Sequence, residues 1–145
     1  MKYLLMKLNF NHINLKSVTK TDHEFLYWIL GQRNPDTNIS HGKMPTFKKH
    51  EKFVASKPYK KWYVIKFLDE RIGSIYLSYQ NEIGLFFKKE YSKTMIANYV
   101  LKIFMKKNPQ HQYFVNINPR NKKSIKFFTK NGFKILQHTY KLEID

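Results

Sequence analysis

The chain has 145 residues, 42% of them hydrophobic, which suits one domain with a buried core and excludes a disordered polypeptide. It contains no cysteine, which excludes disulfides and thiolate chemistry, and no apolar run near the ~20 residues that a transmembrane helix needs. We expect a single domain over residues 1–145, in the cytoplasm and without a membrane partner, because Lys7 cuts short the signal-like apolar start.

The formal net charge is +17, and only three of the 27 basic residues are Arg. One interpretation is a lysine-rich composition that mainly serves solubility. The other is an anionic partner, because a summed positive field concentrates anions near the surface. The scarcity of Arg argues against sequence-specific DNA recognition, which relies on bidentate guanidinium contacts.

The first half of the chain predicts a strand, two helices and a meander. Partial alternation of apolar and polar residues indicates a strand over residues 14–18. A helix over 22–31 follows, with Thr19 or Thr21 as its N-cap, and after a loop a second helix spans 46–56. Three segments rich in β-branched and aromatic residues then predict an antiparallel meander over residues 62–68, 72–79 and 82–87.

The second half predicts a helix, a strand, a helix closed by Gly132, and a last extended region that forms a bent strand or a hairpin. These elements are predicted over residues 92–107, 113–117, 121–131 and 133–142. The order of elements indicates an α+β protein with a mixed sheet that is antiparallel in its first part.

The most specific motif runs from Asn116 to Phe133, NINPRNKKSIKFFTKNGF. It reads as a strand, an Asn followed three residues later by a small residue, a helix, and then K-x-G-F. Together with Gly73-Ser74-Ile75 and the strand opening at Glu82, it resembles the C-terminal half of the GNAT family of N-acetyltransferases. The resemblance implies a GNAT fold with a mixed, mostly antiparallel sheet of six to seven strands, flanked by about four helices and splayed between the fourth and fifth strands.

The resemblance also implies acetyl-coenzyme A as cosubstrate. Its pantetheine arm would pair like an extra strand with the fourth strand, and its pyrophosphate would lie at the N-terminus of the next helix. Asn121 is equally explained as a helix N-cap, and both roles are compatible. The cofactor-binding residues carried over are Leu85, Phe86, Phe87, Ser92, Lys93, Thr94, Met95, Ile96, Ala97, Asn121, Ser124, Phe127, Phe128 and Lys130.

Two positions depart from the family pattern. The pyrophosphate loop of the family carries glycines, whereas residues 91–96 have none, and the side chains of Thr94 and Ile96 narrow the approach to the backbone amides. A family tyrosine that protonates the leaving thiolate corresponds to Phe128, which has no proton to give. Tyr76, Tyr79, Tyr91 and Tyr140 are the tyrosines considered as substitutes.

The candidate bases are Glu82, which opens the strand that would hold the thioester, and His41, whose ordinary pKa lies near ~6.5. Glu82 is also explained as an exposed strand-end residue. The segment 33–45 resembles family members that acetylate amino sugars or nucleotide-linked amino sugars, and it is also explained as a polar loop that ends the first helix. The candidate substrate-binding residues are Arg33, Asn34, Asn38, His41, Tyr76, Ser78 and Gln80.

The sequence therefore predicts an N-acetyltransferase that acts on a primary amine of a small molecule, as a monomer or homodimer and without a metal. One alternative is acetylation of a protein N-terminus or lysine. The other is a GNAT-shaped domain that no longer binds the cofactor and instead binds nucleic acid or an acidic partner, although the leading interpretation includes no nucleic acid.

Overall fold

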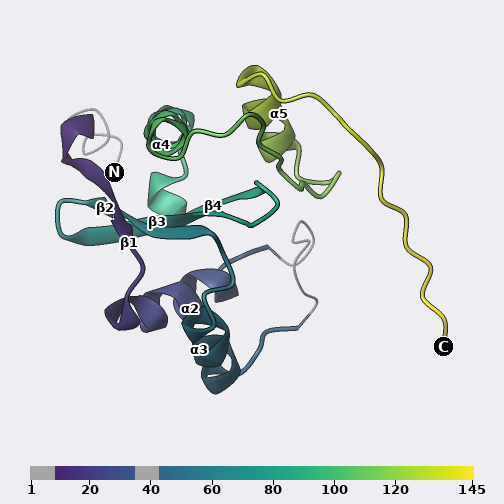
Figure 1. The fold of residues 1–145 in the computed structure, drawn as a ribbon, viewed down its shortest axis with the longest axis horizontal. Coiled ribbons are helices and arrows are strands. Elements are labelled where there is room, and N and C mark those ends of the chain that lie inside the picture. Colours follow the sequence, from purple (N-terminus) through teal and green to yellow (C-terminus); the bar gives the residue numbers. More distant parts are fainter. Residues whose placement is uncertain (1–8, 35–42) are drawn as a thin grey trace.

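The computed structural model describes residues 9–34 and 43–145, which form a sheet with helices on both faces (Figure 1). The sheet has four strands in the order β1-β2-β3-β4, and every neighbouring pair is antiparallel. The strands are β1 (Ile13–Ser17), β2 (Lys61–Phe67), β3 (Glu70–Leu77) and β4 (Ile83–Phe87). The predicted meander is thus confirmed, and β1 joins its β2 edge.

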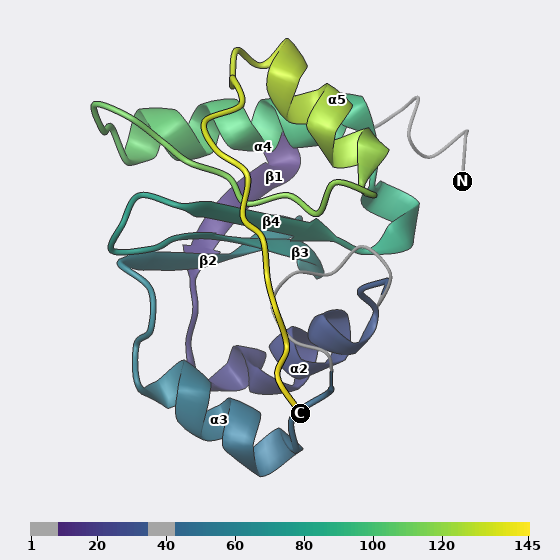
Figure 2. The ribbon, with the colours of Figure 1, turned by 90° about the vertical axis from the view of Figure 1, so that its right-hand side faces the viewer.

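Within residues 9–34 and 43–145, four α-helices form the outer layers (Figures 1 and 2). Helices α2 (His23–Gly31) and α3 (Phe47–Ala55) cover one face of the sheet, whereas α4 (Thr94–Lys107) and α5 (Lys122–Lys130) lie on the opposite side. Three short 3-10 turns precede β1, α2 and α4 over Phe10–His12, Lys20–Asp22 and Lys89–Tyr91. The predicted α+β layout with about four helices is confirmed.

Alternation along the strands divides the interior into two cores. On the α4 side, Ile65, Ile75 and Leu77 are fully buried and pack with Val100 and Phe104. On the other side, Val64 packs with Leu26 of α2 and Val54 of α3 in a smaller cluster. Since both faces are covered, the charged side chains of the two central strands lie near the strand ends, at Lys61, Lys66, Glu70 and Arg71.

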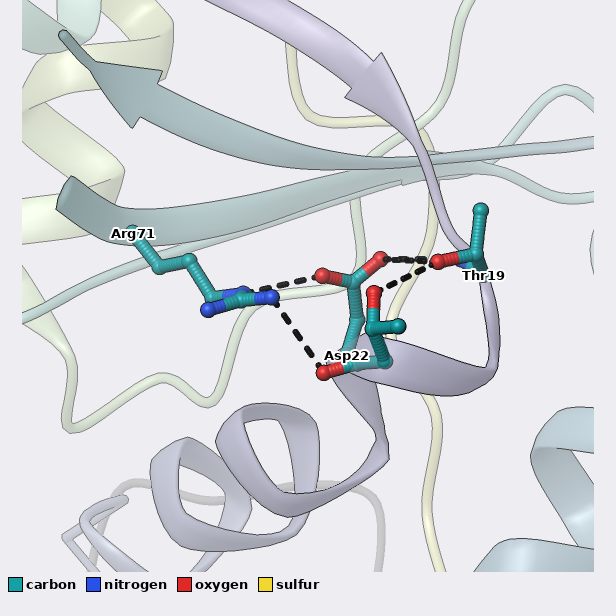
Figure 3. A network of polar contacts seen from close by, with 4 residues as sticks. Thr19, Asp22 and Arg71 are labelled. Carbon is teal, nitrogen blue, oxygen red and sulfur yellow. Dashed lines mark hydrogen bonds and ion pairs between the residues drawn. The ribbon is translucent and has the colours of Figure 1, made fainter. Parts of the chain in front are cut away.

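A buried ion pair fixes the start of α2 against the sheet (Figure 3). The Asp22 carboxylate is 2% exposed, and it accepts hydrogen bonds from Arg71 Nε at 2.9 Å and from the Thr19 backbone N–H at 2.8 Å. Arg71 Nη2 also donates to the Thr21 carbonyl at 3.2 Å. The guanidinium therefore connects β3 to the turn that opens α2.

The segment around residues 113–117 differs from its prediction. It forms only an isolated parallel bridge between Glu82 and Phe114, so within the described residues the sheet has four strands and the predicted six to seven are not found. The bridge consists of Ile83 N–H to Phe114 O at 2.8 Å and Phe114 N–H to Asn81 O at 2.9 Å. Beyond this bridge, the segment 113–117 forms no further backbone hydrogen bond with β4 among the described residues.

The C-terminal region also differs from its prediction. Residues 134–145, called the tail below, are extended and exposed but form no strand or hairpin. Extended apolar sequence forms a strand only when its backbone has a partner, and the described part of the chain supplies none. No helix in the described part of the chain is long and apolar enough to cross a membrane.

Candidate active site

A cavity of about 330 Å³ lies between the sheet and the α2–α3 layer. Its floor comes from β2 and β3, where Trp62, Ser74 and Tyr76 occupy positions on the face opposite α4. Its walls come from α2, α3 and the segments next to them. The complete lining is Leu26, Ile29, Leu30, Arg33, Lys43, Pro45, Lys49, His50, Phe53, Tyr59, Trp62, Ser74 and Tyr76.

Two stacked tyrosines form part of this wall. The rings of Tyr59 and Tyr76 lie parallel, 3.7 Å apart, and Trp62 meets Tyr59 edge-on at 4.8 Å. Tyr76 also lies directly over Gly84 of β4, where a Cβ would come within 2.1 Å of the ring. Glycine is required at that position because any side chain would displace Tyr76 from the cavity wall.

The tyrosine hydroxyls lie in a weakly solvated environment. Burial raises the pKa of Tyr76, and the nearby Arg33 cation partly offsets that rise. Burial also raises the pKa of Tyr59, and its contact with Tyr76 raises it further. Both phenols therefore keep their protons at neutral pH and act as hydrogen-bond donors.

The cavity is cationic. The Arg33 guanidinium stacks over the Phe86 ring of β4, 3.6 Å from its centroid, and burial lowers the pKa of this arginine. Lys43 and Lys49 lie at the rim, while the described lining residues include no Asp or Glu. An arginine keeps its charge in such a setting, so the cavity is suited to a ligand with a negative group.

Glu82 lies where β4 and the segment 113–117 meet. Its carboxylate accepts a hydrogen bond from Ser78 Oγ at 3.1 Å and another from the Asn116 side-chain amide. Ser78 Oγ in turn accepts from the backbone N–H groups of Gln80 and Glu82. The carboxylate is thus held in one orientation by groups on both sides of the junction.

Beyond this junction, β4 has an open edge. The hydrogen bonds from Ser78 N–H to Glu82 O and from Lys88 N–H to Ile72 O indicate that even-numbered residues direct their backbone groups to β3. The backbone groups of Leu85 and Phe87 therefore point the other way, like those of Ile83. Ile83 bonds to Phe114, whereas Leu85 and Phe87 have no backbone partner among the described residues. Their side chains pack on the α4 side, and Phe86 faces the cavity layer.

The open edge leads to the N-terminus of α4. Lys93 precedes the first turn without a side-chain cap, and the backbone N–H groups of Thr94, Met95 and Ile96 have no partner within the described residues. Thr94 and Met95 are exposed, while Ile96 is buried in the core. Exposed N–H groups at a helix start, with its dipole, favour an anion.

A lysine from α5 reaches this helix start. Lys123 Nζ donates to the Ser92 carbonyl at 2.9 Å and to Ser92 Oγ at 3.1 Å. Two helices that are distant in the sequence therefore contribute positive charge to one place. Lys88 has a different role, because it lies 3.8 Å from Glu70 and over the Trp28 ring.

The predicted residues of α5 have clear structural partners. The Asn121 side chain accepts from the Ser124 N–H at 3.2 Å, so the N-cap role is confirmed. Phe128 is 8% exposed in the core, with Phe127 packed beside it, and Lys130 is exposed in the last turn. Ala97 continues the first turn of α4 through its N–H bond to Lys93 O.

The predicted substrate residues separate into three groups. Arg33 and Tyr76 line the cavity together, whereas Ser78 and Gln80 lie at the Glu82 turn and Asn34 is exposed outside the lining. Asn38 and His41 lie outside the described residues. Among the four substitute tyrosines, only Tyr76 lines the cavity.

Sequence reasoning missed several lining residues, above all Tyr59, Trp62 and His50. His50 is 6% exposed and lies between Tyr27 and Phe53. Trp62 Nε1 is buried without a hydrogen-bond partner in the described structure. Positions 62, 64, 74 and 76 lie on one sheet face by strict alternation, and this signal was present in the sequence.

No protein-family model and no curated protein matches the chain. Solved structures do match. A spermidine N-acetyltransferase from Vibrio cholerae in complex with CoA and spermine has a TM-score of 0.71 at 15% identity, over 88% of this chain and 84% of that one. A domain from Methanocaldococcus jannaschii has a TM-score of 0.68 at 21% identity, over 88% and 91%. The ribosomal L7/L12 α-N-protein acetyltransferase RimL, in complex with coenzyme A, has 0.67 at 11% identity, over 87% and 82%.

The protein therefore has the fold of the GNAT acetyltransferases, as the sequence motif around Asn116 to Phe133 predicted. At these identities the likeness establishes the fold, while activity and substrate rest on the residues of this chain.

Proposed function

We propose that the protein is an acetyl-coenzyme A-dependent N-acetyltransferase that acts on a primary amine of a small molecule. The observation that carries this proposal is the open edge of β4, which leads to a free, cationic helix N-terminus within a GNAT fold. The edge offers backbone groups for the pantetheine amides, and the helix N-terminus offers N–H groups and positive charge for the pyrophosphate.

The cofactor would bind along this edge. In this proposal the sheet splays beyond the Glu82–Phe114 bridge, and the pantetheine amides pair with the backbone of Leu85 and Phe87. The pyrophosphate takes the free N–H groups at the start of α4, next to Lys93 and Lys123. Thr94 and Ile96 replace the glycines of the family loop, so affinity depends more on these cations.

The acceptor would bind in the cavity. Its cationic rim and aromatic wall favour an amine that also carries an anionic group and a flat or apolar part. A nucleotide-linked amino sugar has this chemistry, since Arg33 can hold a diphosphate and the aromatic rings can contact a base or sugar. A polyamine carries only positive charge and would be repelled, although similar solved structures act on spermidine.

Transfer requires one base and one acid. The acceptor nitrogen attacks the thioester carbonyl carbon, the C–S bond breaks, the amine proton goes to the Glu82 carboxylate, and the thiolate takes a proton from Tyr76. The fixed carboxylate supports the first assignment. Tyr76 lines the cavity and carries its proton at neutral pH, which supports the second assignment, although its raised pKa makes it a weak acid. The phenolate regains its proton from Glu82 or from water, which completes the cycle. His41 stays a candidate base in the proposal.

A second candidate is acetylation of an acidic protein N-terminus. The fold likeness to RimL, an α-N-protein acetyltransferase, and the cationic cavity favour it, because an acidic peptide would satisfy the same charges. The single-domain organisation and the cytoplasmic location predicted from the sequence stay predictions.

Thermal denaturation with coenzyme A tests the cofactor step. A ligand that binds only the folded state raises the melting temperature by an amount set by its concentration and Kd. We expect millimolar coenzyme A to raise the melting temperature. The increase should be smaller at about 300 mM salt than at about 50 mM salt, because ionic screening is stronger at the higher concentration. Absence of any rise at low salt would contradict both enzymatic proposals and favour a domain without cofactor.

Thiol release from acetyl-coenzyme A then identifies the acceptor. The panel compares nucleotide-linked amino sugars, free amino sugars, an acidic peptide with a free N-terminus, and spermidine. Turnover with nucleotide-linked amino sugars supports the proposal and the charge argument, and turnover with the peptide alone favours the second candidate. Turnover with free amino sugars or spermidine alone would support a small-molecule acceptor but refute the charge argument.

A further inference from the structure

The tail has the pattern of an amphipathic strand. From Leu136 onward, its even positions are apolar or aromatic and its odd positions are polar. Such period-two alternation over ten residues fits a strand with one buried face. The apolar side chains are nevertheless exposed, at 72% for Leu136, 89% for Tyr140, 83% for Leu142 and 87% for Ile144.

The tail already has strand geometry. His138 and Tyr140 stack on one side with ring centroids 6.3 Å apart, and Lys141 forms an ion pair at 2.6 Å with Glu143 on the other. Residues two apart lie on the same side only when the backbone is extended. The segment is therefore shaped as a strand that lacks only a neighbouring backbone.

The base of the tail is fixed in direction. Gly132 has a φ of +90°, a left-handed conformation that ends α5, and Phe133 N–H donates to Phe128 O at 3.0 Å. The Phe133 ring packs edge-on against Phe128 at 5.2 Å. From this anchor the tail runs out to one side of the molecule, and Figure 1 shows it well separated from the sheet of its own chain.

The segment 113–117 offers the matching edge. Phe114 directs its N–H and C=O to the β4 side, so the backbone groups of Tyr113, Val115 and Ile117 point to the opposite side. They have no backbone partner in the described part of the chain. The side chains of these three residues pack against the α4 core, so a strand added there would extend an existing apolar surface.

We infer that the tail pairs as a strand with the segment 113–117 of a second copy of this chain, whose own tail pairs in return. Two identical contacts related by a twofold axis close into a dimer and leave no further free tail. Gly132 and Phe133 direct the tail away from the sheet of its own chain, which favours pairing with a second copy. The charge of the tail is compatible with this pairing. Its two Lys balance one Glu and one Asp, so the net charge of +17 lies in the rest of the chain and the tail is not repelled by a second copy. This inference does not depend on the proposed enzymatic activity.

Light scattering after size-exclusion chromatography of the full chain tests the assembly. We expect twice the chain mass of 17.6 kDa at micromolar concentration. Leu142→Asp places a charge on the apolar side of the tail and should give monomers, whereas Lys141→Thr, on the polar side, should leave the dimer intact. Circular dichroism verifies that each variant is folded. A monomeric wild-type chain, or a Leu142→Asp variant that stays dimeric, would overturn the inference.

Engineered cysteines test the exchange itself and do not depend on the Leu142 variant. Because the chain has no cysteine, one chain receives Val115→Cys and a tagged second chain receives Leu136→Cys, Tyr140→Cys or Leu142→Cys. After mixing through mild denaturation and oxidation, we expect a disulfide-linked heterodimer for at least one tail position. If all three tail positions fail to link the two chains, the tail does not pair with the segment 113–117 of a second copy and the inference fails.

Discussion

Asn116 donates its side-chain amide to the carboxylate of Glu82 across the single bridge that joins β4 to the following extended segment. Ser78 Oγ binds the other carboxylate oxygen at 3.1 Å. A carboxylate held by two side chains keeps one orientation, which a general base needs, and it also connects three parts of the chain. The catalytic and structural roles of Glu82 therefore have to be separated by experiment.

Glu82→Gln separates them, because glutamine keeps an oxygen acceptor for Ser78 or Asn116 but cannot take up a proton. We expect kcat to fall about 10²- to 10⁴-fold, as for loss of a general base, while the melting temperature changes little. Thiol release under saturating substrates and thermal denaturation measure the two effects.

Asn116→Ala is the control for the structural role. It removes the amide but leaves the carboxylate, so kcat should fall far less than in Glu82→Gln. If Glu82→Gln keeps full activity, the base lies elsewhere, with His41 as the next candidate.

Lys123→Ala tests the proposed binding site of the pyrophosphate. The lysine lies at the start of α4 through its bonds to Ser92, and a lost charge-assisted contact to phosphate costs roughly 1.5–3 kcal/mol. We expect coenzyme A to bind about 10- to 100-fold more weakly by calorimetry. Lys106→Ala removes the same charge in the last turn of α4 and should leave the affinity unchanged; equal losses in both variants would indicate a diffuse field rather than a site.

The stacked Tyr59 and Tyr76 predict a loss of stability in alkali. Folding raises the pKa of both phenols above their ordinary value of about 10, so above that pH the unfolded chain releases protons that the folded chain retains. Stability from this pair is thus complete below pH 10 and declines as pH rises toward the folded pKa. Each phenol contributes about 1.4 kcal/mol per pH unit to the slope.

Urea unfolding between pH 8 and 11 measures this slope. Tyr59→Phe and Tyr76→Phe should each flatten it, whereas Tyr79→Phe, which alters a tyrosine that is 62% exposed, should not. A slope that is the same in all three variants would show that the stacked pair does not cause the alkaline loss.

The fold was predictable where local signals agree with tertiary contacts. Periodicity predicted all four helices and the meander, and Thr46, which accepts from Lys49 N–H, begins the second helix as expected. The N-cap predicted for the first helix is wrong, because Thr19 caps the 3-10 turn Lys20–Asp22 and Asp22 itself precedes α2. The segment 113–117 was predicted as a strand, and residues 133–142 as a bent strand or a hairpin. A strand also needs a backbone neighbour, and no local pattern tells whether that neighbour lies in the same chain.

The site was less predictable because it depends on residues brought together from distant elements. Arg33 and Tyr76 were recognised through the family resemblance, but the stack of Tyr76 on Tyr59 joins positions 17 residues apart in different elements. Lys123 reaches Ser92 from another helix, and no spacing in the sequence relates the two. The glycine at position 84 is explained only by the structure, in which the Tyr76 ring lies where a Cβ would be.

The Asp22–Arg71 pair predicts a large stability effect far from the proposed chemistry. Arg71→Ala leaves the Asp22 carboxylate buried with only its Thr19 contacts, and an unpaired buried charge is costly. Because Arg71 is 33% exposed, we expect about 3 kcal/mol, the low end for breaking such a pair, or roughly 6–12 °C in melting temperature. Arg120→Ala, at an exposed turn, is the matched control and should change the free energy of unfolding by less than about 0.5 kcal/mol.

A double-mutant cycle identifies the source of that loss. If the pair acts as a unit, Asp22→Ala/Arg71→Ala should be less destabilised than the sum of the single variants, because it leaves neither a stranded carboxylate nor an unpaired guanidinium. The coupling should exceed about 1 kcal/mol in urea unfolding. Strict additivity would mean that Arg71 stabilises the start of α2 through its bond to the Thr21 carbonyl and its packing, and not through the charge of Asp22.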